Sequence, residues 1–327
     1  MMRAFVCTRL SDDLSGVAVM DQAAPSPGPG EVLVRVRAAS VNFPDILMCQ
    51  GRYQFKPDPP FIPGMDIAGD VVATGHGVDA FAPGDAVAGG ARLGGFAEFA
   101  VAPAAGLRRK PAAMSYAQAA AYQAAYLTAY VALVRRARLQ PGETVLVHGA
   151  AGGVGLAAVD VAKLLGATVI AASASDVKLE AVAARGADHT INVTGGFRDR
   201  VKDLTKGRGA DVIFDPVGGD IFDESVRCIA FDGRLLVIGF TSGRIPSISV
   251  NMPLIKGFSV IGVRAGEYGR QFPERGRENL QAIWRWAEDG RLAPYVHSET
   301  PLRDARKALA LLENRHVIGK AIVRPDL

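Results

Sequence analysis

A glycine-rich turn between an apolar strand and an apolar helix constrains this chain more than any other feature. Residues 145–147 form a short apolar run, and a helical pattern covers 154–165 and ends at Gly166. Between them stand four glycines: Gly149, Gly152, Gly153 and Gly155. Such glycines let the backbone approach a pyrophosphate, which the free N–H groups of a helix N-terminus bind. Ala150 replaces the first glycine of the strict G-x-G-x-x-G pattern, so the prediction depends on the flanking strand and helix.

Strands and helices alternate after this turn, which predicts a parallel sheet. The expected strands cover residues 144–147, 168–172, 189–193, 211–215, 235–240 and 258–263. The expected helices cover residues 154–165, 176–184, 197–206 and 221–230. Because each helix returns the chain to the same edge of the sheet, the pattern predicts right-handed βαβ units in a doubly wound Rossmann sheet.

The first hundred residues are rich in short strands, glycines and prolines, which is typical of a small barrel-like β domain. The expected strands cover residues 3–8, 17–20, 31–38, 67–74, 85–88 and 95–101. One short helix is expected at 42–49, followed by an irregular loop at 57–63. An alanine-rich helix at 115–133 then leads into the second domain.

The end of the chain does not continue the alternation of strands and helices. A polar linker follows Gly266, and helices at 278–289 and 303–312 precede a final strand at 320–323. We expect this segment to return to the first domain. The predicted fold class is therefore α/β. Its two parts are a β-rich domain at 1–122, completed by 265–327, and a Rossmann domain at 123–264.

Composition argues against several classes of protein. The chain has 327 residues, enough for two domains, and 49% of them are hydrophobic. The net charge is +4 without a run of like charges, so we expect no nucleic-acid partner. No apolar run is long enough to span a membrane. Three widely spaced cysteines argue against a disulfide scaffold and indicate a reducing, cytoplasmic compartment.

The segment after the second Rossmann strand indicates which dinucleotide is bound. NAD-binding sites place an acidic residue there to hold the ribose hydroxyls. Here Ser173 occupies that position, and Ser175 and Lys178 follow. Two hydroxyls and an ammonium can hold a 2′-phosphate that a carboxylate would repel, so the sequence favours NADPH. Asp176 weakens this preference, and both serines could instead be only turn and cap residues.

Six motifs occur in an order that resembles a known family. They are Asn42-Phe-Pro-Asp45, Gly51-Arg-Tyr53, Pro63-Gly-Met-Asp-Ile-Ala-Gly69, Pro83-Gly-Asp85, Gly95-Phe-Ala-Glu98 and Ala150-Ala-Gly-Gly-Val-Gly155. Together they resemble the zinc-free quinone oxidoreductase branch of the medium-chain dehydrogenase/reductase superfamily, over nearly the whole chain. The resemblance implies a GroES-like catalytic domain, a Rossmann domain and an active site in the cleft between them. It also implies NADPH as hydride donor and a homodimer built through the Rossmann domain.

The resemblance also assigns roles to individual positions. Those that match the active-site cleft are Asn42, Asp45 and Tyr53. Those that match cofactor contacts are Thr128, Gly152, Gly153, Val154, Gly155, Lys178, Ile238, Phe240 and Arg315. Val193 and Leu47 stand where many family members carry tyrosine, which affects the substrate assignment more than the cofactor.

The residues at the zinc positions of related enzymes are poor metal ligands here. A catalytic zinc needs three ligands from cysteine, histidine or a carboxylate. Zinc members of the superfamily carry cysteine where this chain has Asn42, and Gly-His-Glu where it has Gly64-Met65-Asp66. We therefore expect no metal, and without a Lewis acid the oxidation of an alcohol is disfavoured.

These observations predict an NADPH-dependent reductase that transfers hydride to a quinone or an α,β-unsaturated carbonyl. Tyr53 and Asn42 are expected to donate hydrogen bonds to the developing oxyanion. Each candidate also has a structural interpretation. Tyr53 could pack against the 57–61 loop, Asn42 could bond its own turn, and Asp45 could only cap a helix.

Two alternatives remain open. Enoyl-thioester reductases of the same superfamily carry a similar asparagine, aspartate and Gly-x-Tyr. Convergence of Arg52, Lys56 and Arg92 on a substrate phosphate would favour that function. The other alternative is a crystallin-like or RNA-associated protein that binds NADPH with little turnover. No RNA-binding motif of basic and aromatic residues is present in the sequence.

Overall fold

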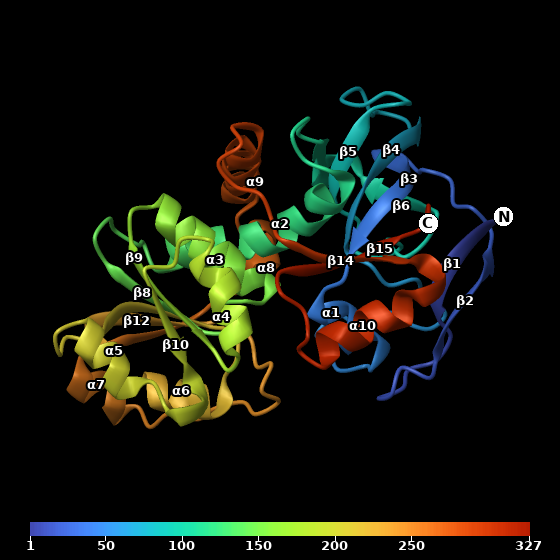
Figure 1. Ribbon diagram of the computed structural model, residues 1–327. Helices are drawn as coiled ribbons and strands as arrows, with labels where there is room; N and C mark the ends of the chain where they lie inside the picture. Colours follow the sequence, from blue (N-terminus) through green and yellow to red (C-terminus); the bar gives the residue numbers. More distant parts are fainter. The chain divides into compact units, whose positions relative to one another are not determined.

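In the computed structural model, which describes residues 1–327, the chain folds as two units (Figure 1). Unit 1 comprises Met1–Ala124 and Trp284–Leu327, and unit 2 comprises Ala125–Ile283. The chain therefore leaves unit 1 inside helix α2 (Tyr116–Tyr130) and returns to it inside helix α9 (Pro273–Glu288).

Unit 2 extends further along the chain than the expected Rossmann boundary at 264. Helix α8 (Ala265–Gln271) occupies part of the segment for which the sequence predicts a polar linker. It packs against a π-helical segment, Val131–Arg136, that continues α2. Arg135 of this segment donates hydrogen bonds to Asn279 Oδ1 and Glu278 Oε2 of α9, both at 2.7 Å. These contacts hold the chain in unit 2 as far as Ile283.

Unit 2 contains a six-stranded parallel sheet in the order β10-β9-β8-β11-β12-β13, as the alternation of strands and helices predicts. The strands are β8 (Thr144–Val147), β9 (Thr168–Ser173), β10 (His189–Asn192), β11 (Ala210–Asp215), β12 (Ile229–Val237) and β13 (Ser259–Gly262). The remaining helices are α3 (Gly153–Leu164), α4 (Asp176–Ala183), the 3-10 turn Val193–Gly195, α5 (Arg198–Leu204), α6 (Gly219–Ser225) and α7 (Asn251–Lys256). From β8 the chain builds the sheet outward to β9 and β10 on one side, and from β11 it builds outward to β12 and β13 on the other side. Doubly wound sheets bind ligands at such a reversal, which here lies between β8 and β11.

One boundary predicted for unit 2 is wrong. The sequence predicts a helix as far as residue 230 and a strand from 235. In the structure α6 ends at Ser225 and β12 begins at Ile229. Ile229 pairs with Ala210 of β11, so tertiary pairing extends the strand into the predicted helix. Helix α7 was also outside the predicted elements.

Unit 1 is built on a seven-stranded sheet in the order β14-β15-β3-β4-β5-β7, in which β6 also pairs with β3. A separate antiparallel pair consists of β1 (Met2–Cys7) and β2 (Val17–Gln22). The strands of the larger sheet are β3 (Glu31–Ser40), β4 (Asp66–Thr74), β5 (Ala86–Gly90), β6 (Phe99–Pro103), β7 (Leu107–Arg109), β14 (Val296–Pro301) and β15 (Lys320–Arg324). The helical segments are α1 (Phe43–Cys49), α10 (Ala305–Glu313) and the 3-10 turns Ala104–Gly106 and Leu302–Asp304.

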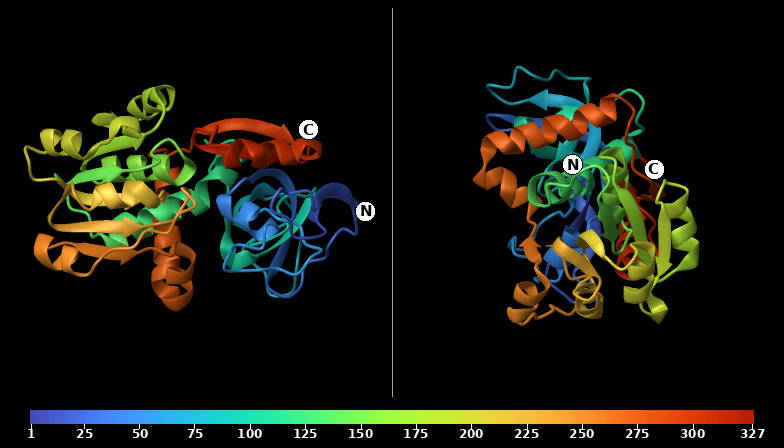
Figure 2. Two further views of the ribbon diagram at one scale, coloured as in Figure 1. Left: turned by 90° about the horizontal axis from the view of Figure 1, so that it is seen from below. Right: turned by 90° about the vertical axis from the view of Figure 1, so that its left-hand side faces the viewer.

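The end of the chain completes the sheet of unit 1. Strand β15 pairs with β3, with Ile322 opposite Ser40, and α10 contacts α1. Figure 2 shows this segment, drawn in red, beside the blue N-terminal part of the chain. Strand β14 was not predicted, because it is an edge strand of mixed polarity that pairs only with β15.

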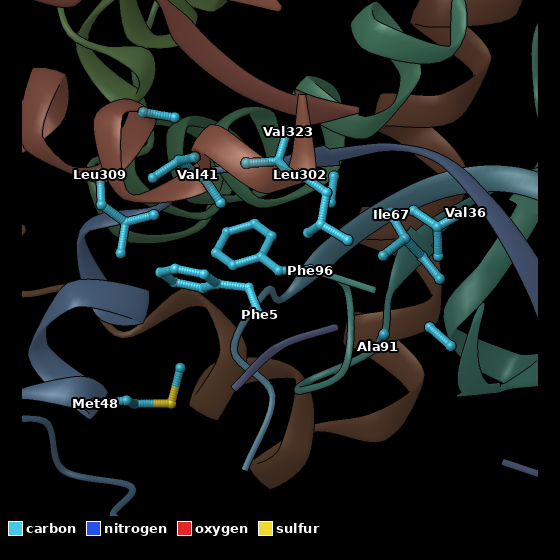
Figure 3. Packing of buried hydrophobic residues seen from close by; sticks show 14 of the residues in the cluster. Phe5, Val36, Val41, Met48, Ile67, Ala91, Phe96, Leu302, Leu309 and Val323 are labelled. Carbon is cyan, nitrogen blue, oxygen red and sulfur yellow. The ribbon is translucent and has the colours of Figure 1, made fainter. Parts of the chain in front are cut away.

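A single apolar core anchors the elements that carry the candidate site of unit 1. The rings of Phe5 and Phe96 lie edge to face with their centroids 6.3 Å apart. Ile67, Leu302 and Met48 join the same core from β4, the C-terminal segment and α1 (Figure 3). Because α1 buries Met48 there, the N-terminus of this short helix is held in a fixed place.

Candidate functional site

The glycine turn of unit 2 has the geometry of a phosphate cradle. Strand β8 ends at Val147, Gly149 has a φ of +55°, and α3 begins at Gly153. A Cβ atom on Gly155 would lie 2.2 Å from the carbonyl oxygen of Gly149, so the helix can approach the turn this closely only with glycine there. The first N–H groups of α3, including that of Val154, have no intrahelical acceptor and remain available to an anion.

Three loops meet at the carboxyl edge of the sheet beside this turn. Gly149 lies against Pro216 and Val217, which follow β11. The loop after β12 contacts the same segment, because the Ile238 amide donates to the Asp215 carbonyl at 2.9 Å. Further along the loop, the ring of Phe240 lies close to Gly218. The structure therefore brings Ile238 and Phe240 to the strand ends next to the glycine turn.

Ser173, Ser175 and Lys178 lie at the next strand end along the sheet. Ser173 is the last residue of β9 and pairs with Asn192 of β10. Ser175 lies at the N-cap of α4, and its hydroxyl makes no capping hydrogen bond. Lys178 lies in the first turn of the same helix. The nearby carboxylate of Asp176 accepts a hydrogen bond from Asn192 Nδ2 at 2.7 Å.

The sequence-predicted residues are divided between the two units. Thr128 lies on the part of α2 that belongs to unit 2, with the glycine turn and the serines. Arg315 lies in unit 1, where it follows α10 with a φ of +57°. Unit 1 also contains Asn42, Asp45 and Tyr53.

Asp45 fixes the backbone at the start of α1. One carboxylate oxygen accepts the N–H of Asn42 at 2.8 Å, and the other accepts the N–H of Gly64 at 3.0 Å. The side chain is fully buried, and this burial raises the pKa of the carboxyl group to about 7. Asp45 thus joins α1 to the loop that precedes β4, which is the capping interpretation considered from the sequence.

Asn42 is the centre of a polar network that sequence reasoning did not find. Its Oδ1 accepts a hydrogen bond from Lys320 Nζ at 2.6 Å. Its Nδ2 donates to Asp66 Oδ2 at 2.9 Å and to the Ser40 carbonyl at 3.2 Å. Burial raises the pKa of Asp66 to about 6 and lowers the pKa of Lys320. The only signal in the sequence is a lysine at the start of an apolar strand.

Tyr53 lies in the loop after α1, partly exposed and packed against the core of unit 1. Two cations of the same region already have partners within the chain. Arg52 forms an ion pair with Asp12 at 2.8 Å. The Arg92 guanidinium lies 3.9 Å from the centroid of the Phe55 ring.

The remaining reactive side chains do not form a second centre. No three histidine, cysteine, aspartate or glutamate side chains are grouped in a way that could hold a metal ion. The three cysteines are unpaired and buried: Cys7, Cys49 and Cys228. Burial raises the pKa of all three thiols, which disfavours the nucleophilic thiolate. None of the helices combines the length and apolar character needed to cross a membrane.

Comparison with known protein families agrees with this architecture. Residues 28–112 match the alcohol dehydrogenase GroES-like domain, and residues 153–285 match the family described as zinc-binding dehydrogenase. A β-rich GroES-like unit joined to a parallel Rossmann sheet defines a class of dinucleotide-dependent oxidoreductases. The chain belongs to the medium-chain dehydrogenase/reductase family.

Individual relatives place the chain among the oxidoreductases of that family. It is 40% identical over 326 residues to a quinone oxidoreductase-like protein 2 homolog of Nematostella vectensis, and the match covers 98% of this chain and 88% of that protein. A quinone oxidoreductase of Pseudomonas syringae has a TM-score of 0.89 at 31% identity, with 99% and 100% of the two chains covered. A mycobacterial protein solved in complex with NADPH has a TM-score of 0.91 at 30% identity, again with 99% and 100% covered.

A segment of a much larger protein is also similar. The chain is 38% identical over 295 residues to part of the polyketide synthase GfsB of Streptomyces halstedii. The match covers 90% of this chain but only 5% of the synthase.

Proposed function

We propose that the protein is an NADPH-dependent reductase that transfers hydride to a quinone or an α,β-unsaturated carbonyl without zinc. The observation that carries this proposal is the set of groups around Asn42. Zinc relatives have a cysteine at this position, whereas here a carboxamide is already bonded to Lys320 and Asp66. Neither a carboxamide nor the thioether of Met65 is a good zinc ligand. Without a metal ion to polarise the substrate, the site is suited to an acceptor whose carbonyl or quinone group is already polarised.

The residues of unit 2 fit a phosphorylated dinucleotide. The turn closed by Gly155 leaves N–H groups facing the pyrophosphate, and Ser173, Ser175 and Lys178 offer hydroxyls and a positive charge to a 2′-phosphate. The NADPH complex of the mycobacterial structure supports the same cofactor. When bound, NADPH supplies the hydride. Thr128, Ile238, Phe240 and Arg315 complete the proposed contacts.

The residues of unit 1 would orient the acceptor and stabilise its oxygen as negative charge develops. Tyr53 provides a hydroxyl donor on a loop anchored in the core, and Asn42 provides amide N–H groups. Asp45 acts through the backbone, because both of its oxygens hold N–H groups of the chain. The proton that the product oxygen requires comes from Tyr53 or from water.

The second candidate function is the reduction of an enoyl thioester. It is favoured by the similarity to a polyketide synthase, and Arg92, whose guanidinium lies over the Phe55 ring, is the candidate for a phosphate contact. Arg52 is a weaker candidate for a phosphate contact, because its charge is paired with Asp12.

We further propose a homodimer formed through unit 2, in a cytoplasmic setting. Strand β13 pairs with β12 on one side only. Phe231 and Leu254 are each 81% exposed near it, and the Phe231 ring lies over Gly257 at the end of α7. Antiparallel pairing of two β13 edges would continue the sheet and cover these apolar side chains.

The proposed function is tested by measuring NADPH and NADH oxidation with the purified protein in the presence of a chelator. The acceptors are a para-quinone, a simple enone and crotonyl-CoA. Turnover of the quinone with NADPH, unaffected by the chelator, is the expected result. Preference for crotonyl-CoA would transfer the assignment to thioester reduction. NADPH binding without turnover of any acceptor would contradict an enzymatic role.

A further inference from the structure

Strand pairing in unit 1 places Lys320 directly opposite Asn42. Strands β15 and β3 are antiparallel, with Val323 opposite Ala39 and Ile322 opposite Ser40. The Val41 amide donates to the Ala321 carbonyl at 2.9 Å, so the ladder continues in the same register. The next position along brings Lys320 to Asn42 across the sheet.

The amino group of Lys320 is buried at this position. The residue is 7% exposed, and Nζ donates to Asn42 Oδ1 at 2.6 Å and to the Val41 carbonyl at 3.2 Å. The carboxylates of Asp66 and Asp45 provide the nearest negative charges. Burying a lysine is unfavourable unless it is paired, and an apolar residue would complete the strand at lower cost. The strand therefore contains a residue whose presence packing does not explain.

Lys320 determines which end of the Asn42 amide faces which neighbour. Because Oδ1 is bonded to a donor, the NH2 group must point toward Asp66 and the Ser40 carbonyl. The reversed amide would place N–H groups against the lysine donor and its oxygen against the Asp66 carboxylate. Lys320 and Asp66 thus fix a single orientation from opposite sides.

The two N–H groups of Asn42 are not equally engaged. The bond to the Asp66 carboxylate is 2.9 Å long, and the bond to the Ser40 carbonyl is 3.2 Å long. The longer bond is the weaker one and can be exchanged for another acceptor oxygen. Asn42 is partly exposed, whereas Lys320, Asp66 and Ser40 are buried. Asn42 is therefore the member of this network that has exposed surface.

We propose that Lys320 is a positioning residue for hydride transfer: it holds the Asn42 amide in the orientation from which the N–H now bonded to the Ser40 carbonyl can be exchanged to the developing oxyanion of the acceptor. The proposal rests on the reductase function proposed above. Hydrogen bonding of Lys320 to Oδ1 also draws electron density from the amide, which strengthens its N–H as a donor. The effect is largest when the acceptor oxygen becomes negative, so it acts on the transition state more than on substrate binding.

The test compares Lys320→Met with Lys110→Met. Lys110 also lies in unit 1 and donates to main-chain carbonyls, those of Pro111 and Met114, but it does not contact Asn42. We expect K320M to lower kcat for the quinone roughly 100-fold with little change in KM, while K110M retains the wild-type kcat. NADPH affinity, measured by fluorescence titration, should be unchanged in both variants, because the glycine turn lies in unit 2.

The outcomes separate this inference from the proposed function. If the wild-type protein reduces no acceptor, the proposed function fails and the inference with it. If the wild type is active and folded K320M matches K110M in kcat, Lys320 has no positioning role. A rise in KM at unchanged kcat would likewise overturn the inference.

A second variant covers the case in which K320M does not fold. Asn42→Ala removes the group through which Lys320 acts, at a partly exposed position. It should lose kcat by a factor similar to that expected for K320M, and wild-type turnover in N42A would overturn the inference. Where both variants fold, the double variant should be no slower than either single one, because the two residues act as a unit.

Discussion

Substituting Gly155 by alanine tests whether the glycine turn of unit 2 is a cofactor site. The new Cβ atom would lie 2.2 Å from the Gly149 carbonyl oxygen and 2.8 Å from Ala150 Cα. Both neighbours are main-chain atoms of the turn, so no flexible side chain can move aside. The helix and the turn must separate by about 1 Å, and overpacking of this kind costs about 1–3 kcal/mol.

Part of this strain will appear as a displacement of the turn that is proposed to bind the pyrophosphate. If half of it, about 0.5–1.5 kcal/mol, is transferred to binding, NADPH affinity falls roughly two- to tenfold, since about 1.4 kcal/mol is a factor of ten. The assay is fluorescence titration of NADPH, accompanied by thermal melting to record the loss of stability. Gly266→Ala is the matched control, because a Cβ atom at Gly266 meets only the Arg270 side chain, at the ordinary contact distance of 3.7 Å. An NADPH dissociation constant in G155A equal to that of G266A, with both proteins folded, would refute the reasoning.

Further predictions concern cofactor choice, assembly and pH. Lys178→Glu should weaken NADPH binding roughly 10–100-fold relative to NADH, as expected for the loss of a charged contact, and unchanged discrimination in paired titrations would argue against the 2′-phosphate site. Leu254→Glu should convert the proposed dimer to a monomer in sedimentation velocity, and a wild type that already sediments as a monomer would remove that proposal. The raised pKa values of Asp45, about 7, and Asp66, about 6, mean that the folded state binds protons more tightly than the unfolded state. The stability that these two carboxyl groups contribute should therefore be lost between about pH 4 and pH 7. The difference in melting temperature between the wild type and Asp45→Asn should shift against the wild type over this interval, and a constant difference would contradict the assignment.

The Rossmann unit could be predicted from the sequence because its signals are local. The strand, the glycine turn and the helix from Thr144 to Leu164 are adjacent along the chain, and each has its own pattern of apolar residues. The misplaced start of β12 shows the limit of this reasoning. Ile229 joins the sheet through its pairing with Ala210. The local sequence around Ile229 is also compatible with a helix, so it does not indicate this pairing.

The network in unit 1 could not be predicted for a related reason. Lys320 and Asn42 are 278 residues apart in the chain, and only the pairing of β15 with β3 brings them together. The motif around Asn42 indicated the importance of that residue but not the direction of its amide. Asp45 and Asn42 were found through family resemblance, whereas Lys320 and Asp66 required the register of two strand pairs.

The order in which the chain is synthesised gives the division into units a further consequence. Unit 2 is continuous along the chain, whereas the sheet of unit 1 receives its β14 and β15 strands from Trp284–Leu327. Domains fold as units during synthesis, beginning with those that emerge first. We therefore expect the nucleotide-binding unit to be folded while β3 still lacks its pairing with β15. Until β15 arrives, the nascent protein would carry the proposed cofactor site without the lysine that we propose to orient Asn42.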